Sequence, residues 1–188
     1  MKKRLYLLLL TVAMVLTVAA CGKKKDTNEK KVNKELQEDL TTFVNEKLPA
    51  IESKRNNAVK IYNSYFESND VDLEAFATEL QGTAIPDMTS YIDELSAIEL
   101  KTDEVKSLRD LYLQSAQKQL DAMNKVSAAL AEQNPDYLSE ADALIDESSE
   151  LLLQYQTNLR KLALDNDIKI NGDFQTSTST DATATDAQ

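Results

Sequence analysis

The chain has 188 residues, of which 21 are basic and 32 are acidic, so its formal net charge is −11. Three glycines and three prolines are too few for the many turns of a β-sandwich or barrel, and this scarcity favours a helical fold. The lack of histidine excludes His-ligated zinc and His-dependent nucleophilic catalysis. A single cysteine excludes an internal disulfide, and the acidic charge argues against nucleic acid as a partner.

Residues 1–20 have the pattern of a secretory signal peptide. Three basic side chains in residues 1–4 precede an apolar run at residues 5–18. That run is shorter than the about 20 apolar residues that span a membrane, and small residues follow it, as they do at a cleavage site. We therefore expect cleavage between Ala20 and Cys21.

The residues around this cleavage point carry a resemblance to a known class. The run Val18-Ala19-Ala20-Cys21 resembles the lipobox of bacterial lipoproteins. The resemblance implies that the Cys21 thiol receives a diacylglyceryl group and that a dedicated peptidase cuts in front of it. Two acyl chains hold a protein firmly to a membrane, so we expect a lipid-anchored protein on the outer face of the cell membrane, with no other cofactor. The alternative is an ordinary secretory signal that ends near a cysteine by chance.

A basic neck at residues 21–31 follows the expected anchor, and its lysines are Lys23, Lys24, Lys25, Lys30 and Lys31. Loss of residues 1–20 removes three basic and no acidic side chains, which changes the net charge from −11 to −14. Basic residues beside anionic lipids favour membrane contact by up to about 1 kcal/mol each. The neck is expected to be a flexible spacer, a lipid-contacting segment, or both.

Residues 32–171 are expected to form one helical domain, because apolar residues recur there at helical spacing. The first apolar stripe runs from Leu36 to Phe66 and stays in phase across Pro49. An internal proline removes a helical hydrogen bond and bends the helix. We therefore predict one kinked helix rather than two unrelated ones.

A second stripe, from Leu73 to Ile98, crosses a proline in the same way. Pro86 lies four residues after Gly82, and a glycine at that position is expected to leave space for the proline ring. The sequence therefore predicts a second kinked helix.

The third and fourth stripes, at residues 105–130 and 137–162, contain no proline. Thr102 precedes the third stripe and is a suitable N-cap. The run Asn134-Pro135-Asp136 precedes the fourth and supplies a cap, a first-turn proline and an acid. Both stripes therefore predict long helices with well-marked starts.

Short connections between long helices force neighbours to run antiparallel. The sequence predicts an all-α fold, an elongated antiparallel four-helix bundle with proline-kinked first and second helices. The alternative is a three-helix bundle from which the Pro49 segment is detached. Residues 172–188 are rich in Thr, Ser and Asp and are expected to be a disordered tail.

Aromatic residues gather at the bundle end that is expected to lie far from the anchor, and they are Tyr62, Tyr65, Phe66, Phe76 and Tyr137. Tyrosine is favoured at interfaces because it combines a large apolar ring with a polar tip. These residues are therefore a candidate binding patch. Most of them also lie on the apolar stripes, and the alternative is that they close the core.

Neither a metal site nor a catalytic site is predicted. The carboxylates of Asp142, Asp146 and Glu150 are spaced four residues apart and could bind Ca²⁺ or Mg²⁺ through oxygen, but a solvated acidic face is the simpler explanation. The chain has no GxSxG run and no Gly-rich phosphate loop, which are signatures of hydrolases and phosphate-binding enzymes. We therefore expect a protein that is not an enzyme.

The lipobox, the Lys-rich neck and the long Tyr- and Leu-striped helices resemble small helical surface lipoproteins of Gram-positive bacteria, including the cell-wall-binding lipoprotein family. We expect a non-enzymatic helical interaction module in the bacterial cell envelope that contacts an envelope protein or the cell wall. One alternative is an accessory lipoprotein that binds a small ligand or a cation. A less favoured one is an envelope hydrolase.

Overall fold

The computed structural model describes residues 33–67 and 72–170, and these residues contain four continuous helical segments and no β-strand. The segments are α1 (Lys34–Thr42) with η1 (Phe43–Lys47) and α2 (Leu48–Glu67), then α3 (Leu73–Glu79) with η2 (Leu80–Ala84) and α4 (Ile85–Ser96), then α5 (Asp103–Glu132), and finally α6 (Asp136–Asp165). The prediction of an all-helical fold with four helices is confirmed. The expected signal peptide, the neck with Cys21 and the tail at 172–188 lie outside the described residues.

The first segment passes its proline by widening into the π-helical turn η1. The backbone N–H of Leu48 donates to the carbonyl of Phe43, five residues earlier instead of four. A proline has no N–H, and its ring crowds the carbonyl four residues before it. One extra residue in the preceding turn lets the helix continue through Pro49.

The second segment repeats this arrangement at the same spacing. The N–H of Ile85 donates to the carbonyl of Leu80, and the π-helical turn η2 again ends two residues before the proline, Pro86. Our interpretation of Gly82 is not supported, because a Cβ atom built on Gly82 meets no atom within 4 Å. The corresponding position before Pro49 is occupied by Asn45. We attribute the accommodation of both prolines to the wide turn rather than to a missing side chain.

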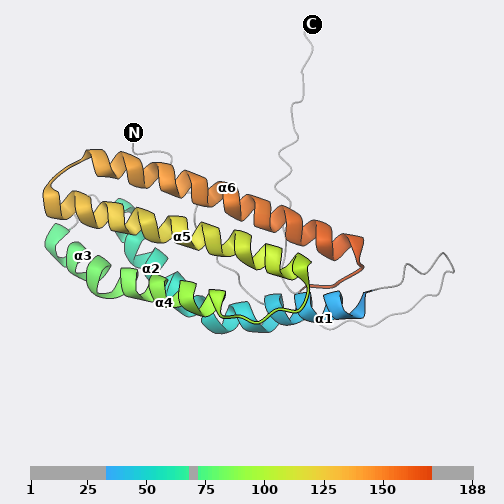
Figure 1. Ribbon diagram of the computed structural model, residues 1–188. Coiled ribbons are helices and arrows are strands. Elements are labelled where there is room, and N and C mark those ends of the chain that lie inside the picture. The colour runs from blue at the N-terminus through green and yellow to red at the C-terminus, as the bar shows by residue number, and fades with distance from the viewer. Residues whose placement is uncertain (1–32, 68–71, 171–188) are drawn as a thin grey trace, which may run out of the picture.

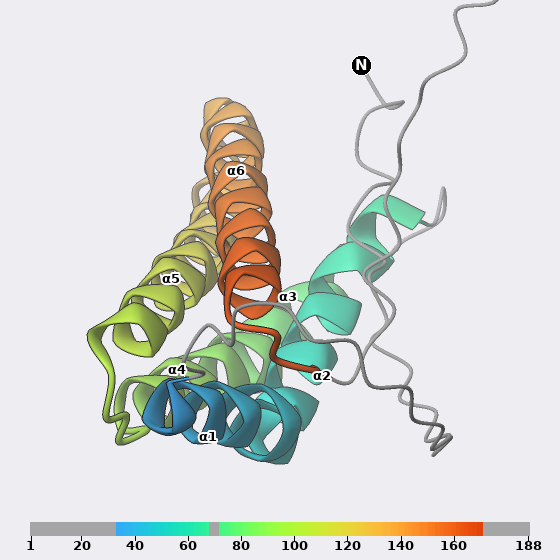
Figure 2. The ribbon, with the colours of Figure 1, turned by 90° about the vertical axis from the view of Figure 1, so that its right-hand side faces the viewer.

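The helices pack side by side into an elongated body (Figure 1). α5 and α6 lie together along their length and are joined by residues 133–135. α4 packs against both α5 and α2, and Figure 2 shows α5 and α6 standing on one side of the body with α1 and α2 on the other. Every helical segment contributes fully buried side chains to one core, among them Phe43, Leu80, Met88, Leu95, Met123 and Leu159.

The two ends of this body are built differently. The start of α1, the start of α5 and the end of α6 lie at one end, and α3 and the turn between α5 and α6 lie at the other (Figure 1). In that turn Gln133 adopts a left-handed conformation, with φ of 53°. Asn134 then accepts a hydrogen bond from the N–H of Asp136 at 3.1 Å. Helix α6 starts at Asp136, so Pro135 is its N-cap and not the first helical residue that we predicted.

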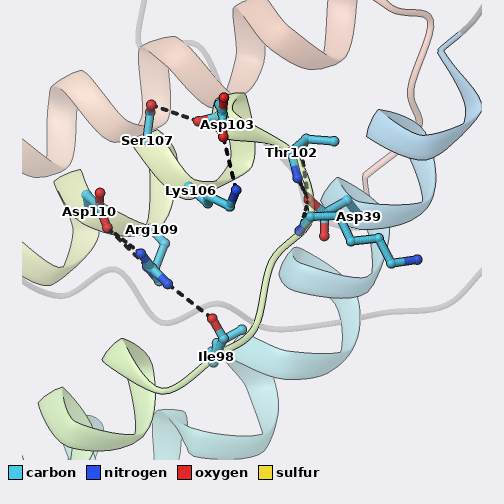
Figure 3. A network of polar contacts seen from close by, with 9 residues as sticks. Asp39, Ile98, Thr102, Asp103, Lys106, Ser107, Arg109 and Asp110 are labelled. Carbon is cyan, nitrogen blue, oxygen red and sulfur yellow. Dashed lines mark hydrogen bonds and ion pairs between the residues drawn. The ribbon is translucent and has the colours of Figure 1, made fainter.

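A carboxylate from α1 holds the start of α5 (Figure 3). Oδ2 of Asp39 accepts hydrogen bonds from the N–H of Lys101 at 3.0 Å, from the N–H of Thr102 at 2.8 Å and from the Thr102 hydroxyl at 2.7 Å. Thr102 is the N-cap of α5, as predicted. Its hydroxyl donates to Asp39, however, and makes no hydrogen bond with the first turn of α5. The contact fixes α1 against α5 across more than sixty residues of sequence.

The environment of Asp39 favours its charged form. Burial acts to raise its pKa, but the hydrogen bonds from Thr102 and Lys101 and the charge of Lys101 act the other way. The hydrogen bonds prevail, and the pKa of Asp39 lies below its ordinary value. Asp39 is therefore an ionised group that is almost completely enclosed, at 6% exposure.

Candidate functional site

Four of the five predicted aromatic residues form one stacked cluster where α2 ends and α3 begins. The Tyr65 ring stacks on Phe76 with centroids 4.9 Å apart and meets Phe66 edge-on at 4.9 Å. Tyr62 lies 5.3 Å from Phe66. Tyr62 and Phe76 are buried, whereas Tyr65 and Phe66 are half-buried. The cluster, named the α2–α3 aromatic cluster below, therefore has a core side and a surface side.

The fifth residue, Tyr137, makes its own contacts at the start of α6. Its hydroxyl donates to Glu132 at 3.2 Å, and the Lys125 ammonium lies 5.0 Å from its ring centroid. Lys125 and Tyr137 border an open hollow of about 430 Å³ between α5 and α6, which is also lined by Asp121, Asn124, Ala128 and Leu144. Tyr137 shares none of the ring contacts of the α2–α3 aromatic cluster.

A second group of tyrosines lies in the middle of the body, and we name it the inner tyrosine cluster; its members are Tyr91, Tyr112 and Tyr155. Tyr112 stacks on Tyr155 at 4.8 Å and meets Tyr91 edge-on at 6.4 Å. All three rings are buried, and burial raises the pKa of each hydroxyl well above its ordinary value. The hydroxyls are therefore neutral donors at neutral pH.

Two charged residues of α2 border the inner tyrosine cluster. The Tyr112 hydroxyl donates to Oε1 of Glu52 at 3.1 Å, and the Arg55 guanidinium carbon lies 5.7 Å from the Tyr112 ring centroid. The positive charge of Arg55 acts to lower the pKa of Tyr91 and Tyr112 against the larger effect of burial. Glu52 and Arg55 are both half-buried.

Among the buried polar atoms that make no hydrogen bond are Nε of Arg55, the Tyr62 hydroxyl and Oε1 of Gln119. The Tyr91 hydroxyl lies beside that of Tyr112, and hydrogen bonding between the two raises the pKa of Tyr91 and acts to lower that of Tyr112. Their neighbours on α5 and α6 are better satisfied. Ser115 and Ser148 exchange hydrogen bonds with each other's carbonyl at 3.0 and 3.1 Å, and Nε2 of Gln119 donates to the Ser148 hydroxyl at 3.1 Å. The unsatisfied atoms belong to α2 and α5, whereas the two serines that join α5 to α6 are paired.

One residue spacing typical of an enzyme is present in α5, but its two side chains bond different partners. Ser115 and Lys118 have the Ser-x-x-Lys spacing found in some acyl-transfer enzymes. The Ser115 hydroxyl is fully buried and bonded to Ser148, however, while the Lys118 ammonium pairs with Glu147 at 2.5 Å. The pair does not form a nucleophile with an adjacent base.

The carboxylates of α6 are spread over an exposed face. Glu140 pairs with Lys125 at 2.6 Å, and burial together with the charge of Asp146 raises the pKa of Asp142. Among the described residues, no three Asp, Glu or Cys side chains are arranged so that they could hold a metal ion.

Sequence reasoning placed the tyrosines of the inner cluster on apolar stripes but missed the polar partners on α2. A signal for Arg55 was present, because it lies seven residues after Leu48 and seven before Tyr62, on the buried face of one helix. No sequence signal distinguishes a paired buried hydroxyl from an unpaired one. The unsatisfied atoms therefore emerge from the structure alone.

Residues 1–169 match the family model of EMYY-motif containing lipoproteins. The chain belongs to this family. Membership makes the protein a bacterial lipoprotein held at a membrane of the cell envelope, and it agrees with the resemblance around Cys21. Neither a curated protein nor a solved structure matches the chain significantly.

The family match does not test the resemblance to cell-wall-binding lipoproteins of Gram-positive bacteria, which stays a prediction. The EMYY-motif lipoprotein family is described without a reaction, ligand or cell-wall partner. This member contains no continuous Glu-Met-Tyr-Tyr run. Within residues 33–67 and 72–170, its helices are either too short or too polar to cross a membrane.

Proposed function

We propose that this lipoprotein is anchored through diacylglycerol on Cys21 and displays a non-enzymatic interaction module on the outer face of the cell membrane. The module is an elongated antiparallel four-helix bundle with proline-adapted first and second segments. It contacts another envelope protein or the cell wall. The family match supports the anchored location, and the α2–α3 aromatic cluster supports the binding role.

The aromatic cluster carries this proposal because it is both rigid and accessible. Tyr65 and Phe66 are half-buried. The Tyr65 ring packs on the buried ring of Phe76, and the Phe66 ring packs on that of Tyr62. Rigid aromatic side chains lose little entropy on binding and dominate interface energies. The cluster also lies at the opposite end of the body from the start of α1 (Figure 1), so that an N-terminal anchor leaves it unobstructed.

The binding role is tested with Tyr65→Ala and Phe66→Ala in the full-length protein. We expect each variant to reduce cross-linking to the envelope partner, or co-sedimentation with purified cell wall, by about tenfold or more, as hot-spot losses of 1.4 kcal/mol or more require. Leu153→Ala is the matched control, because Leu153 is a large apolar residue of α6 with 64% exposure. Equal binding by Tyr65→Ala and Leu153→Ala would contradict the proposal.

The anchor is tested separately by metabolic labelling with palmitate. We expect the full-length protein to incorporate the label and to sediment with membranes. Cys21→Ser removes the thiol that accepts the lipid, so this variant should be unlabelled and keep its uncleaved signal segment. Labelling that persists in Cys21→Ser would show that the lipid is attached elsewhere.

The alternative of a small-ligand or cation-binding accessory lipoprotein draws support from buried polar atoms that lack a partner, such as Nε of Arg55 and Oε1 of Gln119, since most buried polar groups are paired.

A further inference from the structure

The end of the body that carries the α2–α3 aromatic cluster is acidic. Residues 61–100 contain nine acidic side chains and no basic one, and residues 126–159 contain seven acidic side chains and again no basic one. These two stretches include the end of α2, the whole of α3 and the turn between α5 and α6. All of these lie at the end of the body opposite the start of α1 (Figure 1).

Carboxylates of α3 flank the rings of the cluster. Leu73 and Glu79 each lie one helical turn from Phe76. Leu73 is 51% exposed, and Glu74 and Glu79 are exposed as well. Within the described residues, neither glutamate is part of an ion pair. The cluster therefore presents apolar side chains beside carboxylates whose charge is not neutralised.

Asp142 brings a further carboxylate to the cluster from α6. Its charge adds to burial in raising the pKa of the Tyr62 hydroxyl, so the two groups lie near each other. Tyr62 is only 2% exposed, and its hydroxyl makes no hydrogen bond. Burial and the charge of Asp146 in turn raise the pKa of Asp142. Positive charge supplied from outside would relieve the repulsion between these carboxylates.

The surface rings of the cluster also lack a cation. Elsewhere in the described part of the chain, Lys125 lies over the Tyr137 ring and Arg55 over the Tyr112 ring. No basic side chain of the described residues lies over Tyr65. Lys and Arg bind both aromatic faces and carboxylates. A surface that has both groups and no cation of its own is complementary to a basic partner and repels an anionic polymer.

We propose that the α2–α3 aromatic cluster, with Glu74 and Glu79, docks a Lys- or Arg-rich amphipathic segment of a partner protein. Apolar side chains of that segment contact Leu73, Tyr65 and Phe66, and its basic side chains pair with the two glutamates. The proposal rests on the binding role proposed above, and it narrows the partner to a protein with a basic surface.

The test measures binding of a fluorescent amphipathic peptide of Lys and Leu to the full-length protein in detergent, by fluorescence anisotropy. The same peptide with Gln in place of Lys is the neutral probe. We expect the Lys peptide to bind about tenfold more tightly in about 50 mM salt, and this advantage to shrink in about 300 mM salt, because exposed charges are screened. Equal binding of the two peptides would overturn the proposal.

Two matched double variants locate the binding. Glu74→Gln with Glu79→Gln removes two charges beside the cluster, and we expect it to weaken binding of the Lys peptide by about fivefold or more. Glu35→Gln with Glu104→Gln removes two exposed charges at the starts of α1 and α5, at the opposite end of the body. This control should change the affinity by less than about twofold. Equal losses in both double variants would show that the peptide responds to net charge alone, which would refute the site.

Tyr65→Ala separates this proposal from the binding role on which it rests. We expect it to weaken binding of the Lys peptide as well as cross-linking to the envelope partner. If it lowers cross-linking while Glu74→Gln with Glu79→Gln leaves Lys-peptide binding unchanged, the binding role stands and the basic partner is overturned. If Tyr65→Ala changes neither measurement, both proposals fail. A peptide with Glu in place of Lys whose binding depends on Tyr65 would identify an anionic partner instead.

Discussion

Tyr91 and Tyr112 have the same side chain in the same buried cluster, but their hydroxyls have different surroundings. The Tyr112 hydroxyl donates to Glu52 at 3.1 Å, and hydrogen bonding with Tyr112 raises the pKa of Tyr91, as expected when Tyr91 is the donor. Removing the Tyr91 hydroxyl therefore loses one hydrogen bond, whereas removing that of Tyr112 loses two. The two residues therefore form a natural pair for comparison.

We expect Tyr91→Phe to decrease the free energy of unfolding by about 1 kcal/mol, because one hydrogen bond is lost. Tyr112→Phe should decrease it by about 1–3 kcal/mol, because it also leaves Glu52 without its donor. Urea denaturation followed by circular dichroism measures both changes. A gain of stability in Tyr91→Phe would mean that its hydroxyl has no partner in solution.

Asp39 provides a test that depends on pH. Asp39→Ala leaves the N–H groups of Lys101 and Thr102 unbonded, and we expect it to cost about 1–3 kcal/mol at pH 7. The pKa of Asp39 is lowered in the folded protein, so its stabilisation is complete above the unfolded pKa of about 3.8 and is lost as the pH falls through the folded value.

The difference in unfolding free energy between the unsubstituted protein and Asp39→Ala should therefore stay constant from pH 7 to about pH 5 and shrink only as the pH falls through 3.8 and below. Glu38→Ala, at the exposed neighbouring position, is the control and should change stability little. A difference that does not shrink below pH 3.8 would show that the charge of Asp39 is not what holds α5.

For single residues, the sequence predicted which side chains are buried but not which groups they bond. The helical period placed Tyr112 and Tyr155 on buried stripes, and both are buried. The contact between Asp39 and Thr102 spans 63 residues, so no local pattern could predict it. The separation of Tyr137 from the other aromatic residues depends on the rotation of α6, which the period does not determine.

At the scale of the helices, the two π-helical turns are the main departure from expectation. The apolar stripes stayed in phase across Pro49 and Pro86, which correctly indicated continuous segments. The stripes could not reveal the wide turns, because one extra residue shifts the pattern by only about the width of a typical stripe. The explanation that relied on Gly82 is not supported, because a Cβ atom at that position meets no atom within 4 Å.

If the π-helical turn alone makes room for Pro86, then Gly82 is dispensable. We expect Gly82→Ala to stabilise the protein by about 0.5–1 kcal/mol, because alanine restricts the unfolded chain and has the higher helix propensity. Thermal or urea unfolding measures the change. Destabilisation by Gly82→Ala would show that the turn needs the backbone freedom of glycine.

At the scale of the molecule, the scarcity of turn residues and the four apolar stripes were enough to predict an all-helical protein. The apolar start and Cys21 were enough to predict a lipoprotein, in agreement with the family match. The contacts around Tyr112 could not be predicted, since they depend on how side chains from α2, α4 and α5 meet there.

The start of α1 and the end of α6 lie at one end of the body, and this gives the molecule a definite reach. α5 has 30 residues, so at 1.5 Å per residue it separates the two ends by about 45 Å. An anchor before α1 would hold the α5–α6 turn at roughly that height above the lipid, plus the length of the neck. Energy transfer from a membrane dye to fluorophores at Gln133 and at Asn166 would measure this height and would show whether the body stands upright or lies along the surface.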